Sequence, residues 1–221
     1  RSPTASNKDR ATALVIEGGL RLGISTITTA STGNAAVSTA FGAAAAGLRA
    51  VIFVSADCQP GKLALMTQAG ARVFGVADGY AAAVDLSRAA ARAFGWLDRN
   101  TGANPITLEA KKTVAFEVWE QLGRRMPDVM IAPVGDGPTL VALDKGFGEL
   151  VACGLAERRP RLVGVQADRC QPLVRAWSGT PPMPQELDPA ATVADGIAVR
   201  RPAIGDAVLD AVRGSGGGMV A

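Results

Sequence analysis

Three short polar segments of this sequence carry groups that could do chemistry. The first holds Lys8 among small polar residues and is followed by Asp9-Arg10. The second is Ser31-Thr32-Gly33-Asn34, and the third is Gly135-Asp136-Gly137-Pro138-Thr139. The chain contains no histidine, so imidazole catalysis is excluded. Proton transfer therefore falls to lysine, the carboxyl groups, Tyr80 or a cofactor.

Lys8 precedes an amphipathic run from Ala11 to Leu20 and is expected in the first turn of a helix. One interpretation is a solvated lysine at the surface. The other is a nucleophilic lysine, whose amine must be desolvated or lie near another cation so that its neutral form is populated. The residues beside Lys8 leave both interpretations open.

The other two segments each connect a predicted strand to a predicted helix. Residues 31–34 would place amides and hydroxyls at the positive end of a helix, where a carboxylate binds, or they form an ordinary N-cap. Residues 135–139 would let several N–H groups converge on a phosphate, or they form a generic turn. The third segment lacks the Lys-Ser/Thr ending of a Walker loop and the G-x-G-x-x-G spacing, which disfavours a nucleotide.

The elements that must position these segments alternate along the chain. Runs rich in Val and Ile predict buried strands at 24–30, 50–55, 71–76, 129–134 and 161–166. Helical spacing predicts helices at 35–46, 62–68, 81–94, 111–122 and 140–153. Met219 to Ala221 resemble the start of another strand. This alternation predicts an α/β architecture with parallel sheets.

Composition excludes several classes of function. The net charge is only +3 and no long Lys/Arg run occurs, which argues against nucleic-acid binding. Cys58, Cys153 and Cys170 form no C-x-x-C pair, which argues against a metal site or a disulfide framework and favours the cytoplasm. The longest apolar tract, residues 34–56, is interrupted by glycines and an arginine, so we expect no membrane span.

In their order along the chain, the three segments resemble those of the threonine synthase branch of pyridoxal 5′-phosphate (PLP) enzymes. These enzymes have fold type II and belong to the tryptophan synthase beta-like superfamily. Residues 3–10 read P-T-A-S-N-K-D-R and resemble the P-T-G-S-F-K-D-R signature of that family. The resemblance implies that Lys8 holds PLP as a Schiff base and then acts as the general base.

The same resemblance implies roles for the other segments. Ser31, Thr32, Gly33 and Asn34 would bind the carboxylate of an amino-acid substrate, and Asn34 would also bind PLP. Gly135, Asp136, Gly137, Pro138 and Thr139 would hold the PLP phosphate, although Pro138 replaces a usual glycine and removes an amide donor. Residues 104–113, N-P-I-T-L-E-A-K-K-T, are similar to the family's N-P-x-R-L-E-G-x-K-T. Asn104 and Lys111 are therefore implied to line the substrate site.

The activity implied is that of a lyase performing β/γ-elimination or replacement, as in the conversion of O-phosphohomoserine, or a related O-activated amino acid, in amino-acid biosynthesis. Thr107 stands where the motif has arginine, and loss of that anion clamp leaves two alternatives open. They are a serine/threonine ammonia-lyase and an O-activated-serine synthase. An alternative of another class is a degenerate, non-catalytic PLP-binding homologue.

The resemblance also implies an architecture. We expect two open parallel-sheet α/β domains with the active site in the cleft between them. Residues 24–95 would form a small inserted domain, and residues 1–23 and 96–221 a larger PLP-binding domain that is incomplete at both ends. A cytoplasmic homodimer is expected, with no metal.

Overall fold

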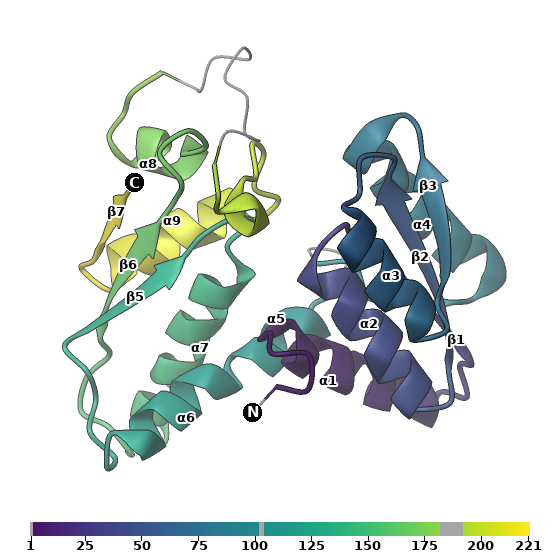
Figure 1. Ribbon diagram of the computed structural model, residues 1–221. Coiled ribbons are helices and arrows are strands. Elements are labelled where there is room, and N and C mark those ends of the chain that lie inside the picture. Colours follow the sequence, from purple (N-terminus) through teal and green to yellow (C-terminus); the bar gives the residue numbers. More distant parts are fainter. Residues whose placement is uncertain (1, 102–103, 182–191) are drawn as a thin grey trace. The chain divides into compact units, whose positions relative to one another are not determined.

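The computed structural model describes residues 2–101, 104–181 and 192–221. The chain divides into two compact units, Arg1–Ala110 and Lys111–Ala221, called unit 1 and unit 2 below. Each unit is built on its own parallel sheet with helices packed against it (Figure 1). The predicted α/β class with parallel sheets is therefore confirmed.

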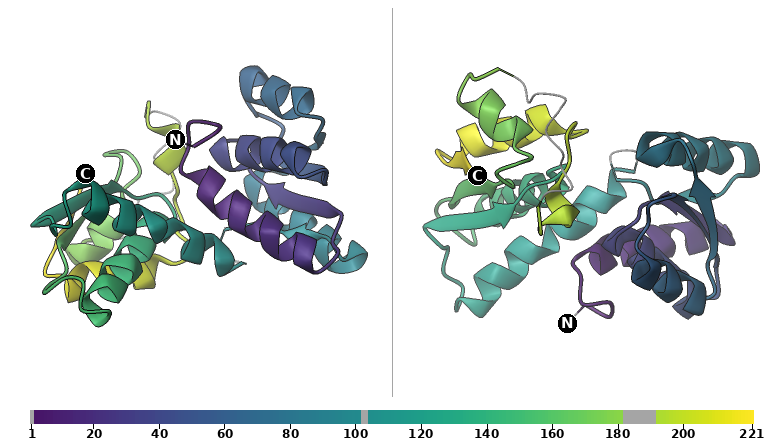
Figure 2. Two further views of the ribbon diagram at one scale, coloured as in Figure 1. Left: turned by 90° about the horizontal axis from the view of Figure 1, so that it is seen from below. Right: turned by 45° about the horizontal axis from the view of Figure 1, so that its top comes forward.

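Unit 1 has a four-stranded parallel sheet in the order β3-β2-β1-β4. Its strands are β1 (Thr26–Ala30), β2 (Arg49–Ser55), β3 (Arg72–Val76) and β4 (Leu97–Asp98). Its helices are α1 (Lys8–Arg21), α2 (Asn34–Ala45), α3 (Pro60–Gln68), α4 (Gly79–Phe94) and α5 (Ile106–Lys111). Helices α2 and α3 cover one face of the sheet and α4 covers the other, while α1 packs against α2 (Figures 1 and 2).

Unit 2 has a three-stranded parallel sheet in the order β5-β6-β7. Its strands are β5 (Val129–Pro133), β6 (Arg161–Val165) and β7 (Gly218–Val220). Its helices are α6 (Thr113–Gln121), α7 (Pro138–Ala152), α8 (Pro172–Trp177) and α9 (Gly205–Gly214), with a short 3-10 helix, η2 (Asp195–Ile197). Helices α7 and α9 pack on the sheet, and their buried Leu140, Phe147 and Val208 form the core with Leu162.

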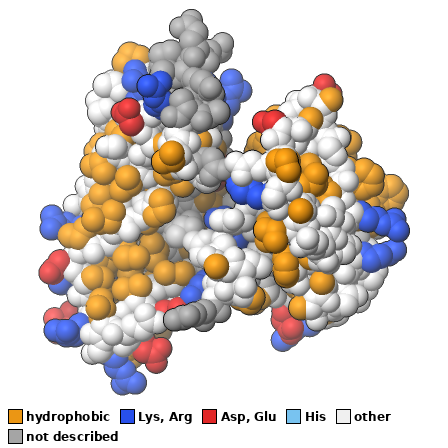
Figure 3. Space-filling model, viewed as in Figure 1, with side chains coloured by type: hydrophobic (Ala, Val, Ile, Leu, Met, Phe, Trp, Pro, Cys, Tyr) orange, Lys and Arg blue, Asp and Glu red, His pale blue; other side chains and the backbone are white. Residues whose placement is uncertain are grey.

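All five predicted strands are present within two residues of their expected bounds, and β7 begins beside Met219 as predicted. Of these strands, only β1 is buried along its full length. The prediction of burial is wrong for β3 and β5 because both lie at sheet edges. Ile131 of β5 is 63% exposed, and Figure 3 shows apolar side chains gathered over this part of unit 2.

The helix predicted at 111–122 is wrong in one respect, because two helices, α5 and α6, occupy this region and are separated at Lys112. The Lys112 carbonyl lies against α7, where a Cβ on Gly146 would sit 2.6 Å from its oxygen. The break between α5 and α6 therefore lies where the backbone of Lys112 packs closely against α7. Two short elements, β4 and α8, carry too little periodicity to be predicted. Helix α9 is not among the predicted helices, although its buried Val208, Leu209, Ala211 and Val212 follow a helical spacing.

The compact units do not follow the predicted domain bounds of 24–95, 1–23 and 96–221. Helix α1 packs on α2, and β4 pairs with β1, so residues 2–23 and 96–110 belong to unit 1. The predicted domain division of the whole protein stays a prediction. Among the described residues, no helix is long and apolar enough to cross a membrane.

Candidate functional site

Lys8 is the first residue of α1 and is half-buried. Its Nζ donates a hydrogen bond to Asn7 Oδ1 at 3.3 Å. The preceding loop is closed by Asp9, whose two carboxylate oxygens accept from the Thr4 N–H and hydroxyl, each at 2.7 Å. Ala5 has a left-handed φ of 57°, at the position where the resembled signature has glycine. The loop before Lys8 therefore keeps a glycine-type turn without the glycine.

The turn at 31–34 leads into α2, and Gly33 is its N-cap residue. The Gly33 N–H donates to Ser31 Oγ at 3.1 Å, and Asn34 is exposed as the first residue of the helix. Among the described residues, no side chain caps α2. The interpretation of residues 31–34 as an ordinary side-chain N-cap is therefore wrong. The N–H groups at the start of α2 are therefore not capped by a described side chain, and this positive end of the helix suits an anion.

Helices α1 and α2 bring Lys8 and the 31–34 turn to the same end of unit 1. The Ser38 hydroxyl donates to Thr12 Oγ1 at 2.7 Å. Farther along the helices, a Cβ on Gly42 would lie 3.1 Å from Ile16 Cδ1. Both contacts join residues 26 apart in sequence, so the helices run side by side in the same direction. The same register places Lys8 beside the start of α2.

Arg99 lies beneath the first turns of α1 and was not identified from the sequence. It is fully buried. Its guanidinium donates to the Lys8 carbonyl at 3.4 Å and to the hydroxyls of Thr12 and Thr101, each at 3.3 Å. Burial lowers the pKa of Arg99 to about 10, so the side chain remains a cation at neutral pH. A buried positive charge thus touches the backbone of Lys8.

Asn100 holds the end of β1 and was also missed. Its Oδ1 accepts from the Ala30 N–H at 2.7 Å and from the Thr29 hydroxyl at 3.3 Å. Its Nδ2 donates to Ser87 Oγ at 2.9 Å. Ala30 directly precedes Ser31, so Asn100 anchors the chain just before the 31–34 turn. Arg99 and Asn100 carried no sequence signal, because a polar pair after a two-residue strand is typical of a surface loop.

The glycine-rich turn of unit 2 connects β5 to α7. Gly137 has a φ of 90°, and a Cβ there would lie 2.0 Å from Val208 Cγ2. A Cβ on Gly135 would lie 3.1 Å from Val199 Cγ2 and 3.2 Å from Ile197 Cα. Neither glycine can be replaced without moving its neighbours.

This turn has features that suit a phosphate. Pro138 is the first residue of α7, where a helix does not need the N–H that proline lacks. Among the described residues, no side chain caps α7. Asp136 Oδ1 accepts from the Ala203 N–H at 3.3 Å, and Thr139 lies in the first turn. Small residues before a 15-residue helix therefore fit the phosphate of PLP.

Asn104 and Lys111 lie at the two ends of α5. The Asn104 side chain donates to the Asp98 carbonyl at 2.9 Å and accepts from the Ile106 N–H at 3.0 Å. The nitrogen and the oxygen of the Asn104 side chain thus both have partners nearby in the sequence, and the bond to Ile106 lies at the start of α5. Lys111 is buried at the end of that helix. Their implied roles in substrate binding stay predictions.

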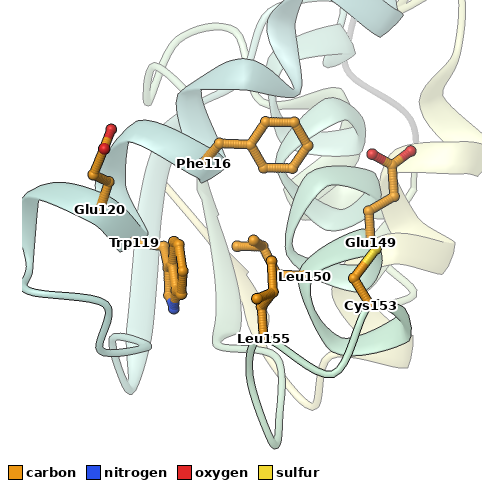
Figure 4. A pocket seen from close by; sticks show the side chains of 7 residues that line it. All are labelled: Phe116, Trp119, Glu120, Glu149, Leu150, Cys153 and Leu155. Atoms are coloured by element: carbon orange, nitrogen blue, oxygen red, sulfur yellow. The ribbon is translucent and has the colours of Figure 1, made fainter.

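A cavity of about 350 Å³ lies between α6 and α7, and none of the predicted site residues lines it (Figure 4). Phe116 and Trp119 of α6 face Leu150 of α7 across it. The cavity is near the C-terminal end of α7, about 20 Å along the helix from the glycine-rich turn. Among the described residues, no group of three or more His, Cys, Asp or Glu side chains could hold a metal ion.

The parallel α/β fold and the strand-to-helix turns in each unit are typical of proteins that bind phosphorylated cofactors. The family model described as pyridoxal-phosphate dependent enzyme matches residues 1–221. The chain belongs to this family.

Among curated proteins, the chain is similar to several threonine synthases. It is 34% identical to that of Methanosarcina acetivorans over 218 residues, covering 98% of this chain and 53% of the relative. It is 33% identical to that of Mycobacterium bovis over 221 residues, covering 100% of this chain and 59% of the relative. The chain therefore spans little more than half the length of these relatives.

Solved structures share the fold at lower sequence identity. Threonine deaminase isoform 2 from Solanum lycopersicum matches with a TM-score of 0.77 and 18% identity, over 95% of this chain and 55% of that chain. An L-serine ammonia-lyase from Rhizomucor miehei matches with a TM-score of 0.78 and 17% identity, over 99% of this chain and 67% of that chain. These likenesses confirm fold type II for the described units.

Proposed function

We propose that this protein uses PLP for elimination or replacement at the β or γ carbon of an amino acid, as threonine synthases do. O-Phosphohomoserine is the first substrate to test. The observation that carries the proposal is the pairing of α1 with α2, which brings Lys8 to the start of a helix with no side-chain cap in the described structure. This pairing supports the proposal, because the Lys8 amine would then act beside a helix start that suits a carboxylate.

The chain's own residues would divide the work as follows. Lys8 would attach covalently to the cofactor and then accept the α-proton of the substrate at its Nζ. Residues 31–34 would bind the substrate carboxylate, with Asn34 also contacting the cofactor. Residues 135–139 would hold the phosphate. When bound, PLP supplies the electron sink that makes the α-proton acidic.

Covalent trapping tests the role of Lys8. Full-length protein is incubated with PLP, reduced with borohydride and mapped by peptide mass spectrometry. We expect a visible absorbance band that borohydride removes, and a pyridoxyl group on Lys8. Lys8→Ala should abolish this adduct, whereas Lys62→Ala, at a lysine of α3, should leave it unchanged. Folded protein without an adduct on Lys8 would instead support a degenerate, non-catalytic homologue.

A second candidate, favoured by Thr107, is an ammonia-lyase or a synthase acting on an O-activated serine. Thr107 is buried, and its hydroxyl donates to the Asn104 carbonyl at 2.8 Å. It therefore cannot replace the anion-binding arginine of the resembled motif. Release of phosphate and threonine from O-phosphohomoserine would support the first candidate. Formation of a keto acid from serine or threonine, or consumption of O-acetylserine, would support the second.

We further propose that the protein is a homodimer. Sedimentation equilibrium of the full-length protein tests this, and a single species at the monomer mass would contradict it.

A further inference from the structure

Arg99 is the largest of the described side chains that are less than 2% exposed. Its hydrogen bonds to described residues all end on neutral oxygens, those of Thr12, Thr101 and the Lys8 backbone. Removing a guanidinium from water is costly even when it is hydrogen-bonded. A residue that contributed only stability would be served better by an apolar side chain. The position of Arg99 therefore needs another explanation.

The contacts of Arg99 connect the two helices that carry the site segments of unit 1. The Thr12 hydroxyl accepts from Arg99 Nε at 3.3 Å and from the Ser38 hydroxyl at 2.7 Å. Thr12 lies one turn after Lys8 in α1, and Ser38 lies one turn after Asn34 in α2. The chain Arg99–Thr12–Ser38 thus ties the first turns of both helices together. The direct bond to the Lys8 carbonyl fixes the start of α1.

We infer that Arg99 is a positioning residue, which holds the first turn of α1 so that the Lys8 amine stays beside the start of α2. The planar guanidinium suits this task because it donates in several fixed directions at once, which lysine cannot do. Small displacements of a nucleophile are costly in rate. This inference rests on the proposed function of Lys8.

The test uses pyridoxal, which lacks the phosphate and therefore reports on Lys8 without the glycine-rich turn. The rate of borohydride-trapped adduct at Lys8 is measured by peptide mapping in full-length protein. Arg99→Met keeps much of the volume but removes every donor, and we expect the rate to fall by about tenfold or more. Arg99→Lys should restore part of it. The thermal midpoint of Arg99→Met should stay within about 4 °C of wild type, and labelling of Lys62 should not change.

Wild-type labelling of Lys8 in Arg99→Met would overturn the inference. So would equal changes at Lys8 and Lys62, because those indicate general loosening of unit 1. Absence of any Lys8 adduct in the wild type would instead overturn the proposed function, on which the inference depends.

Thr12 supplies a second test if Arg99→Met does not fold. Thr12→Val keeps the shape that packs against Gly42 but removes the hydroxyl. Thr12→Ser keeps the hydroxyl but removes the methyl group. We expect labelling of Lys8 to slow by about threefold or more in Thr12→Val and to stay within about twofold of wild type in Thr12→Ser. Equal rates in the two variants would overturn the inference.

Discussion

The two units hold their candidate site segments in different ways. In unit 1, buried polar side chains hold the segments, with Arg99 bonded to the start of α1 and Asn100 to the end of β1. In unit 2, apolar packing bears on the glycine-rich turn itself, with Val208 filling the space beside Gly137. One buried polar contact precedes the turn, because Gln166 Nε2 donates to the Val134 carbonyl at 3.3 Å. Unit 1 therefore depends mainly on donors and acceptors, whereas the glycines of the unit 2 turn are constrained mainly by shape.

The difference has a physical reason. A phosphate is bound by backbone N–H groups, so its turn needs only the correct backbone path, which close packing can impose. A reactive side chain needs its own helix turn fixed against its neighbours, and directional hydrogen bonds do this better than apolar contacts. Substitutions should therefore act through sterics in unit 2 and through unsatisfied polar groups in unit 1.

Gly137→Ala should have the largest effect. The new Cβ would meet Val208 Cγ2 at 2.0 Å and would force a left-handed φ on a non-glycine residue. We expect a loss of about 3 kcal/mol in the free energy of unfolding, measured with urea. Gly154→Ala is the matched control, since Gly154 has a similar positive φ with nothing within 4 Å of the added Cβ. It should cost about 1 kcal/mol. Equal costs would mean that packing against Val208 does not constrain the turn.

Asn100→Ala should come next. It removes the acceptor of the Ala30 N–H and leaves that buried donor without its partner. We expect a loss of about 2 kcal/mol, together with faster hydrogen exchange at the Ala30 amide. Ser87→Ala removes the hydroxyl that accepts from Asn100 Nδ2 and should cost about 1 kcal/mol in the free energy of unfolding. The Ala30 amide should keep its wild-type exchange rate, because its bond to Asn100 remains. Unchanged exchange in Asn100→Ala would contradict a polar anchor in unit 1.

Ala5→Gly should have a smaller effect, in the stabilising direction. It removes the cost of a left-handed φ at a residue with a Cβ, which exceeds the larger unfolded-state entropy of glycine. We expect a gain of about 0.5 kcal/mol by thermal unfolding. Arg124→Gly changes a residue of unit 2 with a similar φ of 61°, so its change in stability is compared with that of Ala5→Gly. A loss of stability in Ala5→Gly would show that the loop before Lys8 is not strained.

Glu149→Gln should have the smallest effect. Hydrogen bonds from Lys145 and then from Lys112 lower the pKa of the Glu149 carboxyl. Its contribution to stability is therefore present above the ordinary carboxyl pKa and is lost as the pH falls through the lowered value. The side chain is 33% exposed, so solvent screens these pairs and we expect a loss of only about 0.3 kcal/mol at neutral pH. Urea unfolding at neutral pH and near pH 3 should show the difference disappearing in acid.

Much of the fold could be predicted from the sequence because its signals are local. Alternating apolar runs and helical spacing predicted β1, β2, β3, β5 and β6 within two residues. Gly47, Gly70, Gly95 and Gly123 each lie just past a predicted helix, and all have the positive φ that is typical of helix ends. The polar turns at 31–34 and 135–139 were predicted to join a strand to a helix, and both do.

The sequence by itself therefore determined the α/β class, the order of its main strands and helices, and the family, which depend on neighbouring residues and short motifs. Only the tertiary structure decided that Arg99 is buried against Lys8, a contact between residues 91 positions apart. It also decided the register of α1 on α2, the exposure of β3 and β5 as edge strands, and the break at Lys112. These features arise from packing between segments far apart in the chain, and no local pattern records which segments will meet.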